Sequence, residues 1–219
     1  MKVSAGNNGD FQQPEPGTYL ARCIRITDIG TQSGEYQGKA TSRRQLILGW
    51  ELPEELIPTG ERQGEPFMVS KFYTMSLNEK ATLRHDLVAW RGKEFTANEL
   101  EGFEMKNVLG AACMVTVTLN DSGRTKVASV AGVPKSMKAK MPAQVNPSVC
   151  FSLELDEFDQ ATYGGLSDGI KRMVDASPEM ATIRRGGGSK TVKDDFGDVD
   201  FREEENAMQG YDGDDELGF

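Results

Sequence analysis

Basic and aromatic side chains recur together along the chain. Lysine and arginine neutralise phosphates, and a tyrosine ring offers a face on which a nucleobase stacks, so this mixture is typical of surfaces that bind single-stranded nucleic acid. Aromatic residues in β-strands are more often core, which we expect of Trp50, Phe72 and Trp90, while Tyr36 and Tyr73 stay open between core and stacking. The candidate contact residues are Arg22, Arg25, Tyr36, Lys39, Arg43, Arg44, Lys71, Tyr73, Arg124 and Lys126.

Residues for catalysis or metal binding are sparse. The single histidine, His85, lies among basic residues, and Cys23, Cys113 and Cys150 form no Cys-x-x-Cys pair, so we expect no structural zinc, no cofactor and no enzymatic activity. One acidic cluster resembles a metal or nuclease site by count, although two of its members also fit the cap and first turn of a helix. That cluster consists of Glu154, Asp156, Glu157 and Asp159.

The net charge of -9 is unevenly distributed. Residues 186–219 hold eleven acidic and three basic residues, which leaves the preceding 185 residues at -1. Three glycines at 186–188 predict a flexible joint, and the charged sequence after them predicts a disordered acidic tail. At the end of the chain, an aromatic residue behind an acidic cluster suits a partner pocket with a basic rim. The candidate partner-binding residues are Asp214, Asp215, Glu216, Leu217 and Phe219.

Alternating apolar residues predict β-strands over 17–26, 43–52, 67–75, 112–119 and 124–133. Ser76 and Glu79 fit a capping box, which predicts a helix that begins there and ends at Gly92, and Thr96 with Glu99 predicts a second, shorter helix. Residues 134–148 read as a loop, 149–155 as a possible sixth strand, and 156–163 and 167–175 as short helices.

This order predicts a mainly β fold with helices, of the α+β class. Three strands, a helix and two strands match a five-stranded OB-type barrel with a helix between strands three and four. The predicted organisation is an N-terminal arm (1–16), the barrel (17–133), a loop and helical extension packed on the barrel or against another copy (134–185), and the acidic tail (186–219).

Several segments resemble phage-encoded single-stranded DNA-binding proteins, and the resemblance covers most of residues 17–180. The tail is similar to the acidic tips of bacterial and phage single-strand binders, except that Leu217 and Gly218 stand where the bacterial tip has Ile-Pro. The matching segments are 19–22 (YLAR), 28–32 (DIGTQ), 50–52 (WEL), 70–77 (SKFYTMSL), 90–93 (WRGK), 102–104 (GFE), 107–110 (NVLG) and 151–158 (FSLELDEF).

The resemblance implies a sequence-independent single-stranded DNA-binding protein of phage DNA replication or recombination, whose tail recruits partner proteins. Two alternatives stay open: a protein–protein adaptor that binds no DNA, and a metal-dependent nuclease. Apolar runs are too short for a membrane span, residues 1–10 lack a secretory signal, and scattered cysteines suit a reducing compartment, so we expect a cytoplasmic protein and a possible homo-oligomer.

Overall fold

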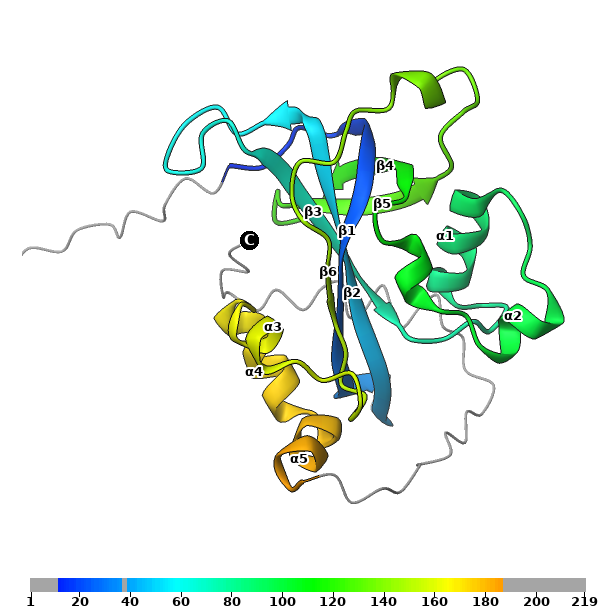
Figure 1. Ribbon diagram of the computed structural model, residues 1–219, viewed down its shortest axis with the longest axis vertical. Coiled ribbons are helices and arrows are strands. Elements are labelled where there is room, and N and C mark those ends of the chain that lie inside the picture. Colours follow the sequence, from blue (N-terminus) through cyan, green and yellow to red (C-terminus); the bar gives the residue numbers. More distant parts are fainter. Residues whose placement is uncertain (1–11, 37–38, 187–219) are drawn as a thin grey trace, which may run out of the picture.

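A curved, six-stranded sheet forms the centre of the molecule, with helices on two sides of it (Figure 1). The computed structural model describes residues 12–36 and 39–186. Five strands are antiparallel neighbours in the order β3-β2-β1-β4-β5, and β6 pairs with β1 in parallel. The strands are β1 (Gly17–Tyr36), β2 (Lys39–Leu56), β3 (Pro66–Thr74), β4 (Ala112–Leu119), β5 (Thr125–Ala131) and β6 (Val149–Phe151).

The predicted α+β class is confirmed, and so are the three strands, helix and two strands in this order. The sheet does not close into a barrel, because β3 and β5 stand at its two ends and form no ladder with each other within the described residues, and the OB-type assignment stays a prediction. Helix α1 (Thr82–Arg91) contacts both of these end strands. Its apolar residues Leu83, Leu87 and Trp90 are buried there. The core between β3 and β5 is therefore covered by a helix and not by hydrogen-bonded pairing of these two strands.

The start of α1 differs from the expected position. Ser76 caps no helix; its hydroxyl accepts a hydrogen bond from the amide of Asn78 (3.2 Å), and the chain turns before α1 begins at Thr82. The next helix, α2 (Ala97–Glu101), has the capping box expected of Thr96 and Glu99. The side-chain oxygen therefore stabilises a local turn at Ser76 but a true helix start at Thr96.

The main core lies between the sheet and α1. Alternation along β2 buries Leu46, Leu48, Trp50 and Leu52 on this side, as the sequence predicts. The Trp50 and Trp90 rings pack with centroids 6.3 Å apart. Each such side chain contributes roughly 1.5–3 kcal/mol or more through burial.

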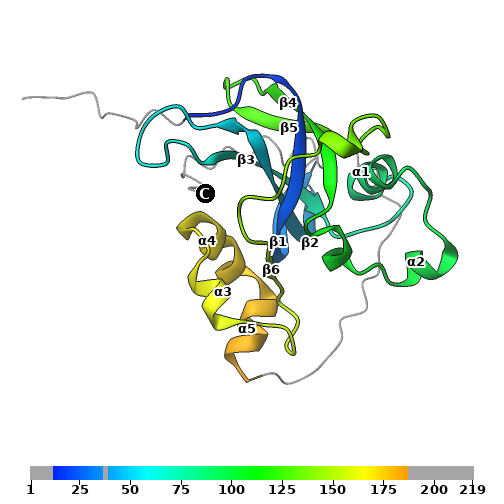
Figure 2. The ribbon, with the colours of Figure 1, turned by 45° about the horizontal axis from the view of Figure 1, so that its top comes forward.

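Three short helices lie on the side of the sheet away from α1 (Figure 2), and a second core lies between them and the sheet. Ile29 and Ile47 from the sheet, with Phe72 packed beside them, meet Ile170 and Val174. The helices concerned are α3 (Gln160–Gly164), α4 (Asp168–Ala176) and α5 (Pro178–Arg184). Helix α3 begins four residues later than predicted, because Asp159 is its N-cap and accepts the Thr162 amide, and the sequence reading missed α5.

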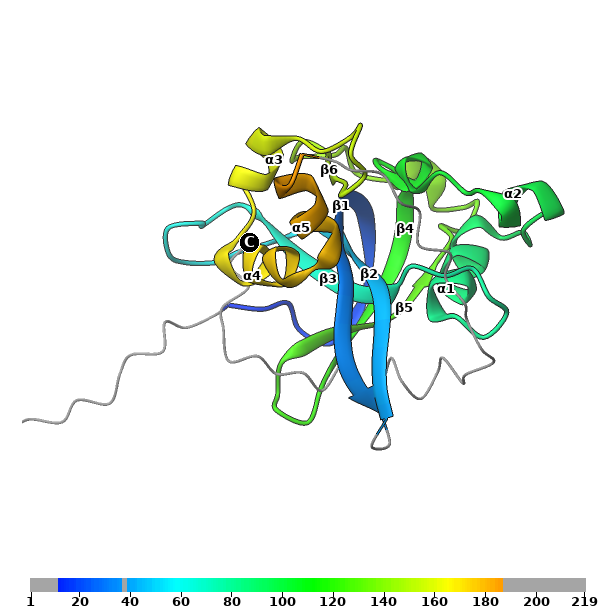
Figure 3. The ribbon, with the colours of Figure 1, turned by 90° about the horizontal axis from the view of Figure 1, so that it is seen from below.

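Strands β1 and β2 extend beyond the rest of the sheet as a two-stranded hairpin (Figure 3). The pairing of β2 with β3 stops at Gln45, whereas β1 and β2 stay paired to Tyr36 and Lys39. Within the described residues, no helix is long and apolar enough to cross a bilayer.

Candidate functional site

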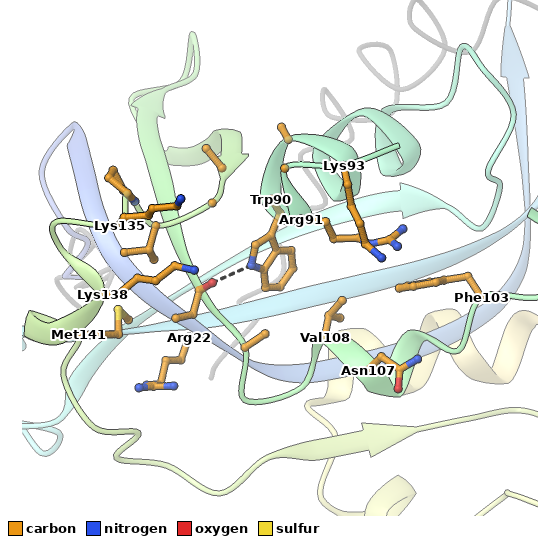
Figure 4. Close-up of a pocket in the computed structure, with 18 of the residues that line it drawn as sticks. Arg22, Trp90, Arg91, Lys93, Phe103, Asn107, Val108, Lys135, Lys138 and Met141 are labelled. Carbon is orange, nitrogen blue, oxygen red and sulfur yellow. Dashed lines mark hydrogen bonds between the residues drawn. The ribbon is translucent and has the colours of Figure 1, made fainter. Parts of the chain in front are cut away.

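A groove of about 1060 Å³ lies beside the C-terminal end of α1 (Figure 4). Its walls come from the last turn of α1, the short helix η1 (Met105–Val108), the start of β4 and the loop that follows β5. The volume lies at the upper end of the range of about 300–1,000 Å³ for small-molecule pockets. The groove therefore suits a ligand that extends along the surface.

The base of the groove is apolar and held by backbone contacts. The Trp90 indole donates a hydrogen bond to the carbonyl of Ala112 (2.8 Å), and the Gly132 amide donates to Ala89 (3.1 Å). A Cβ atom at position 132 would lie 2.6 Å from the Trp90 carbonyl oxygen, so the close approach of this loop to α1 requires glycine. Trp90, Phe103 and Val108 thus lie within a fixed framework.

Positive charge dominates the rim. The lining contains five basic residues and one acidic residue, Glu99. Gly92 ends α1 in a left-handed conformation (φ 67°), after which Lys93 stands at the rim beside the helix end. Lys135 and Lys138 are exposed on the opposite wall. The basic lining residues are Arg22, Arg91, Lys93, Lys135 and Lys138.

Two charged side chains tie the lysine-bearing loop to the sheet. The Arg22 guanidinium donates to the carbonyls of Pro142 (2.8 Å) and Gly110 (2.9 Å). The fully buried Glu51 carboxylate accepts hydrogen bonds from the amides of Val145 (2.8 Å) and Asn146 (2.9 Å) and from the Asn146 side chain (2.9 Å). With Gly132 held at the other end, the lysines lie on a segment fixed on both sides.

Of the residues predicted from sequence, Arg22 alone lines the groove. Lys39 is exposed at the β1–β2 hairpin, and Arg124 and Lys126 are exposed at the β4–β5 hairpin. From Lys126 to Ala131 at the groove, β5 covers roughly 17 Å at the usual rise per residue. A ligand that contacts both places must therefore span at least this distance.

The other predicted arginines are partly or fully covered. Arg25 is half-buried against Gly49, and burial lowers its pKa. Arg43 is only 7% exposed. Arg44 forms ion pairs with Asp28 (2.6 Å) and Glu154 (2.7 Å). These side chains lie beneath or beside other parts of the protein rather than on an open surface.

Lys71 and Tyr73 meet a common carboxylate inside the protein. Lys71 Nζ lies 2.9 Å from Asp86 Oδ2, and the Tyr73 hydroxyl donates to the same oxygen (2.7 Å). Tyr73 is 1% exposed and Lys71 is 6% exposed. The Tyr73 ring presents no face to a base here, which decides the open choice between core and stacking in favour of core.

Some predicted residues lie outside the described part of the chain. The Tyr36 side chain is among them, although its backbone ends β1. So are the proposed partner-binding residues of the tail, namely Asp214, Asp215, Glu216, Leu217 and Phe219.

The acidic cluster considered for metal binding is spread over separate contacts. Glu154 pairs with Arg44, Glu157 pairs with Lys106, and Asp159 caps α3. Across residues 12–36 and 39–186, no group of three or more histidine, cysteine or acidic residues has a geometry suited to a metal ion.

Sequence reasoning missed most of the groove: Lys93, Phe103, Asn107, Lys135 and Lys138. The sequence did contain a signal for Lys135 and Lys138. From Ser122 to Leu153 the chain contains five basic residues and no acidic one, and this is the longest stretch of one charge sign in residues 1–185. Lys93 and Phe103 lie in two of the segments that resemble the phage proteins, but only the fold shows that they share a groove with this segment.

Searches against protein-family models, curated proteins and solved structures found no match to this chain.

Proposed function

We propose that this protein binds single-stranded DNA without sequence preference, through the groove beside α1. The observation that carries the proposal is the combination of five basic side chains with an apolar base, in which the Phe103 ring is partly exposed and Trp90 is 8% exposed and packs into the main core. Lysine and arginine contact the phosphates of any sequence, and every nucleobase has an apolar face for the groove.

The apolar base favours single-stranded over double-stranded DNA. In a duplex the bases are stacked inside, and the phosphates alone would reach the basic rim. An unpaired strand places bases and phosphates on the same surface, which matches the apolar base and charged rim. The β-strand order, with a helix between β3 and β4, also supports an OB-type relationship, and OB folds bind oligonucleotides.

The resemblance of several segments to phage single-stranded DNA-binding proteins supports a role in phage DNA replication or recombination, in the cytoplasm of the host cell. In that role the protein covers exposed single strands and carries out no reaction. Arg124 and Lys126 at the β4–β5 hairpin, and Lys39 at the β1–β2 hairpin, extend the contact beyond the groove.

The test compares binding of full-length protein to oligo-dT and to a duplex of equal length over a series of salt concentrations. The double variant Lys135→Gln/Lys138→Gln removes two exposed groove charges, so the log–log salt slope should flatten by roughly 1.4, about 0.7 for each lost phosphate contact. Lys80→Gln is the matched control, because Lys80 is exposed before the opposite end of α1.

Three results would contradict the proposal. They are equal affinity for duplex and single strand, an unchanged slope in the folded double variant, and the same loss in Lys80→Gln. A protein that binds no DNA but captures acidic peptides through the groove would be an adaptor instead.

For the tail we propose recruitment of replication or recombination proteins through Phe219 and the acidic residues before it. Deleting Phe219 removes an aromatic anchor without changing side-chain charge. It should leave oligo-dT affinity unchanged and abolish capture of the partner in a pull-down from infected cells. An unchanged pull-down would reduce the tail to a solubilising segment.

A further inference from the structure

Among residues 12–36 and 39–186, Glu99 is the one acidic side chain that lines the groove. Its Oε1 atom contacts two groove cations, forming a hydrogen-bonded ion pair with Arg91 Nη2 and lying 3.6 Å from Lys93 Nζ. The opposite oxygen, Oε2, accepts the Thr96 amide (2.9 Å) as part of the α2 capping box. Oxygen Oε2 of this carboxylate therefore caps α2, and oxygen Oε1 neutralises the positive charges of Arg91 and Lys93.

The position of Arg91 is fixed by aromatic rings. Its guanidinium carbon lies 4.3 Å from the centroid of Phe95 and 5.1 Å from that of Phe103. The side chain is 14% exposed, its Nη1 atom is buried without a hydrogen-bond partner among the described residues, and its Nη2 atom donates to Glu99, so Nη2 is the group that an anion can reach by replacing that carboxylate. Lys93, by contrast, is 65% exposed and free to follow an incoming charge.

We propose that Arg91 and Lys93 form a phosphate subsite, which the Glu99 carboxylate occupies in the free protein and a DNA phosphodiester takes over on binding. This inference rests on the proposed function, because the ligand is the backbone of the same single strand. The Phe103 ring, which packs against the Arg91 guanidinium, and the Asn107 side chain line the same groove (Figure 4). A base attached to that phosphate therefore has an aromatic ring and an amide in the same groove.

The exchange retains the local fold. Glu99 keeps its hydrogen bond from the Thr96 amide through Oε2 while Oε1 gives up the two cations. The phosphodiester brings its own charge and several acceptor oxygens, and further phosphates along the strand bind the remaining lysines. A single free carboxylate or phosphate lacks this added contact, so the internal carboxylate selects for polyanions.

Replacing the carboxylate tests this exchange directly. Glu99→Gln retains an oxygen for the Thr96 amide but releases Arg91 and Lys93, so affinity for oligo-dT should rise about two- to five-fold, the range of a partly exposed ion pair. The salt slope should stay close to that of the wild-type protein, because the phosphodiester takes over both cations in either protein. Glu101→Gln is the matched control, because Glu101 is exposed on the same helix and lies outside the groove; it should change neither quantity.

A second variant tests the subsite and leaves the residues of the α2 capping box unchanged. Lys93→Gln should flatten the slope by roughly 0.7 in both backgrounds, but it should lower the affinity more in the Glu99→Gln background, because Glu99 competes for the lysine in the wild-type protein. Thr96→Ala weakens the cap but keeps the carboxylate, so it should not tighten binding. Melting temperatures of all variants confirm that they are folded.

The outcomes separate this inference from the proposed function. If the wild-type protein binds no oligo-dT, the proposed function fails and the subsite fails with it. If the wild-type protein binds but Glu99→Gln binds equally or more weakly, only the subsite is overturned. Equal losses of affinity from Lys93→Gln in both backgrounds would also overturn it.

Discussion

Replacing Lys71 by alanine separates a nucleic-acid contact from a structural ion pair. Its place on the same side of a predicted strand as Tyr73 predicts contact with phosphate, but the side chain is 6% exposed and pairs with Asp86. Removing one partner of a buried pair costs about 3–5 kcal/mol. Asp86 retains the Tyr73 hydroxyl and is 15% exposed, so we expect the lower end, about 3 kcal/mol.

Urea unfolding followed by tryptophan fluorescence measures this loss. With a denaturant slope of about 2 kcal/mol/M, the midpoint should fall by roughly 1.5 M. Lys80→Ala, on the exposed turn before α1, should shift the free energy of unfolding by less than about 0.5 kcal/mol. The salt slope of oligo-dT binding should stay the same in both folded variants. An unchanged midpoint together with a slope flattened by about 0.7 would refute the assignment of Lys71 to the interior and place it at a phosphate.

Three further predictions use other parts of the structure. Gly132→Ala should destabilise the protein by roughly 1–3 kcal/mol, since its Cβ would meet the Trp90 carbonyl, and should also weaken oligo-dT binding; thermal unfolding with a binding titration measures both. Burial raises the pKa of Glu179, but hydrogen bonds from Thr31 outweigh it and lower the pKa below its usual value. Stability from Glu179 is therefore present above the unfolded value of about 4.3 and lost as pH falls through the folded pKa, so Glu179→Gln should flatten this part of an acid unfolding curve. Burial raises the pKa of Cys23 to about 12 and also raises that of Cys113, so a thiol reagent at pH 8 should modify half-buried Cys150 first, and all three cysteines in urea.

The fold was largely predictable because its signals are local. Alternation along β2, the hairpin turn after Leu119 and the capping box at Thr96 each depend on a few neighbouring residues. The full length of β1 was not predictable in this way. Its second half contains glycines and polar residues, which read as a loop, and its pairing with β2 is what holds it extended.

The predicted binding residues would be exposed only if one face of each strand were open to solvent, and the sequence alone does not show which face is open. Adjacent residues such as Arg43 and Arg44 point to opposite faces of β2, so one of them should reach the surface on any open sheet. Here the core and α1 cover one face, and α3 to α5 pack on part of the other. Both faces of these strands are therefore occupied, so that Arg44 pairs with Asp28 and Glu154, and Lys71 pairs with Asp86.

The groove shows why net charge is a poor guide to the ligand of this chain. Charges on a surface act over a screening length of about 10 Å at 0.1 M salt, so acidic residues elsewhere contribute little at the groove. At the groove itself, Lys135 and Lys138 line the same surface as Arg91 and Lys93, which lie more than 40 residues earlier in the sequence. The fold of the sheet and α1 therefore gathers positive side chains at the groove, although the net charge of the whole chain is -9. The salt slope of single-strand binding measures that local concentration, because it counts the phosphates neutralised at contact rather than the charge of the whole molecule.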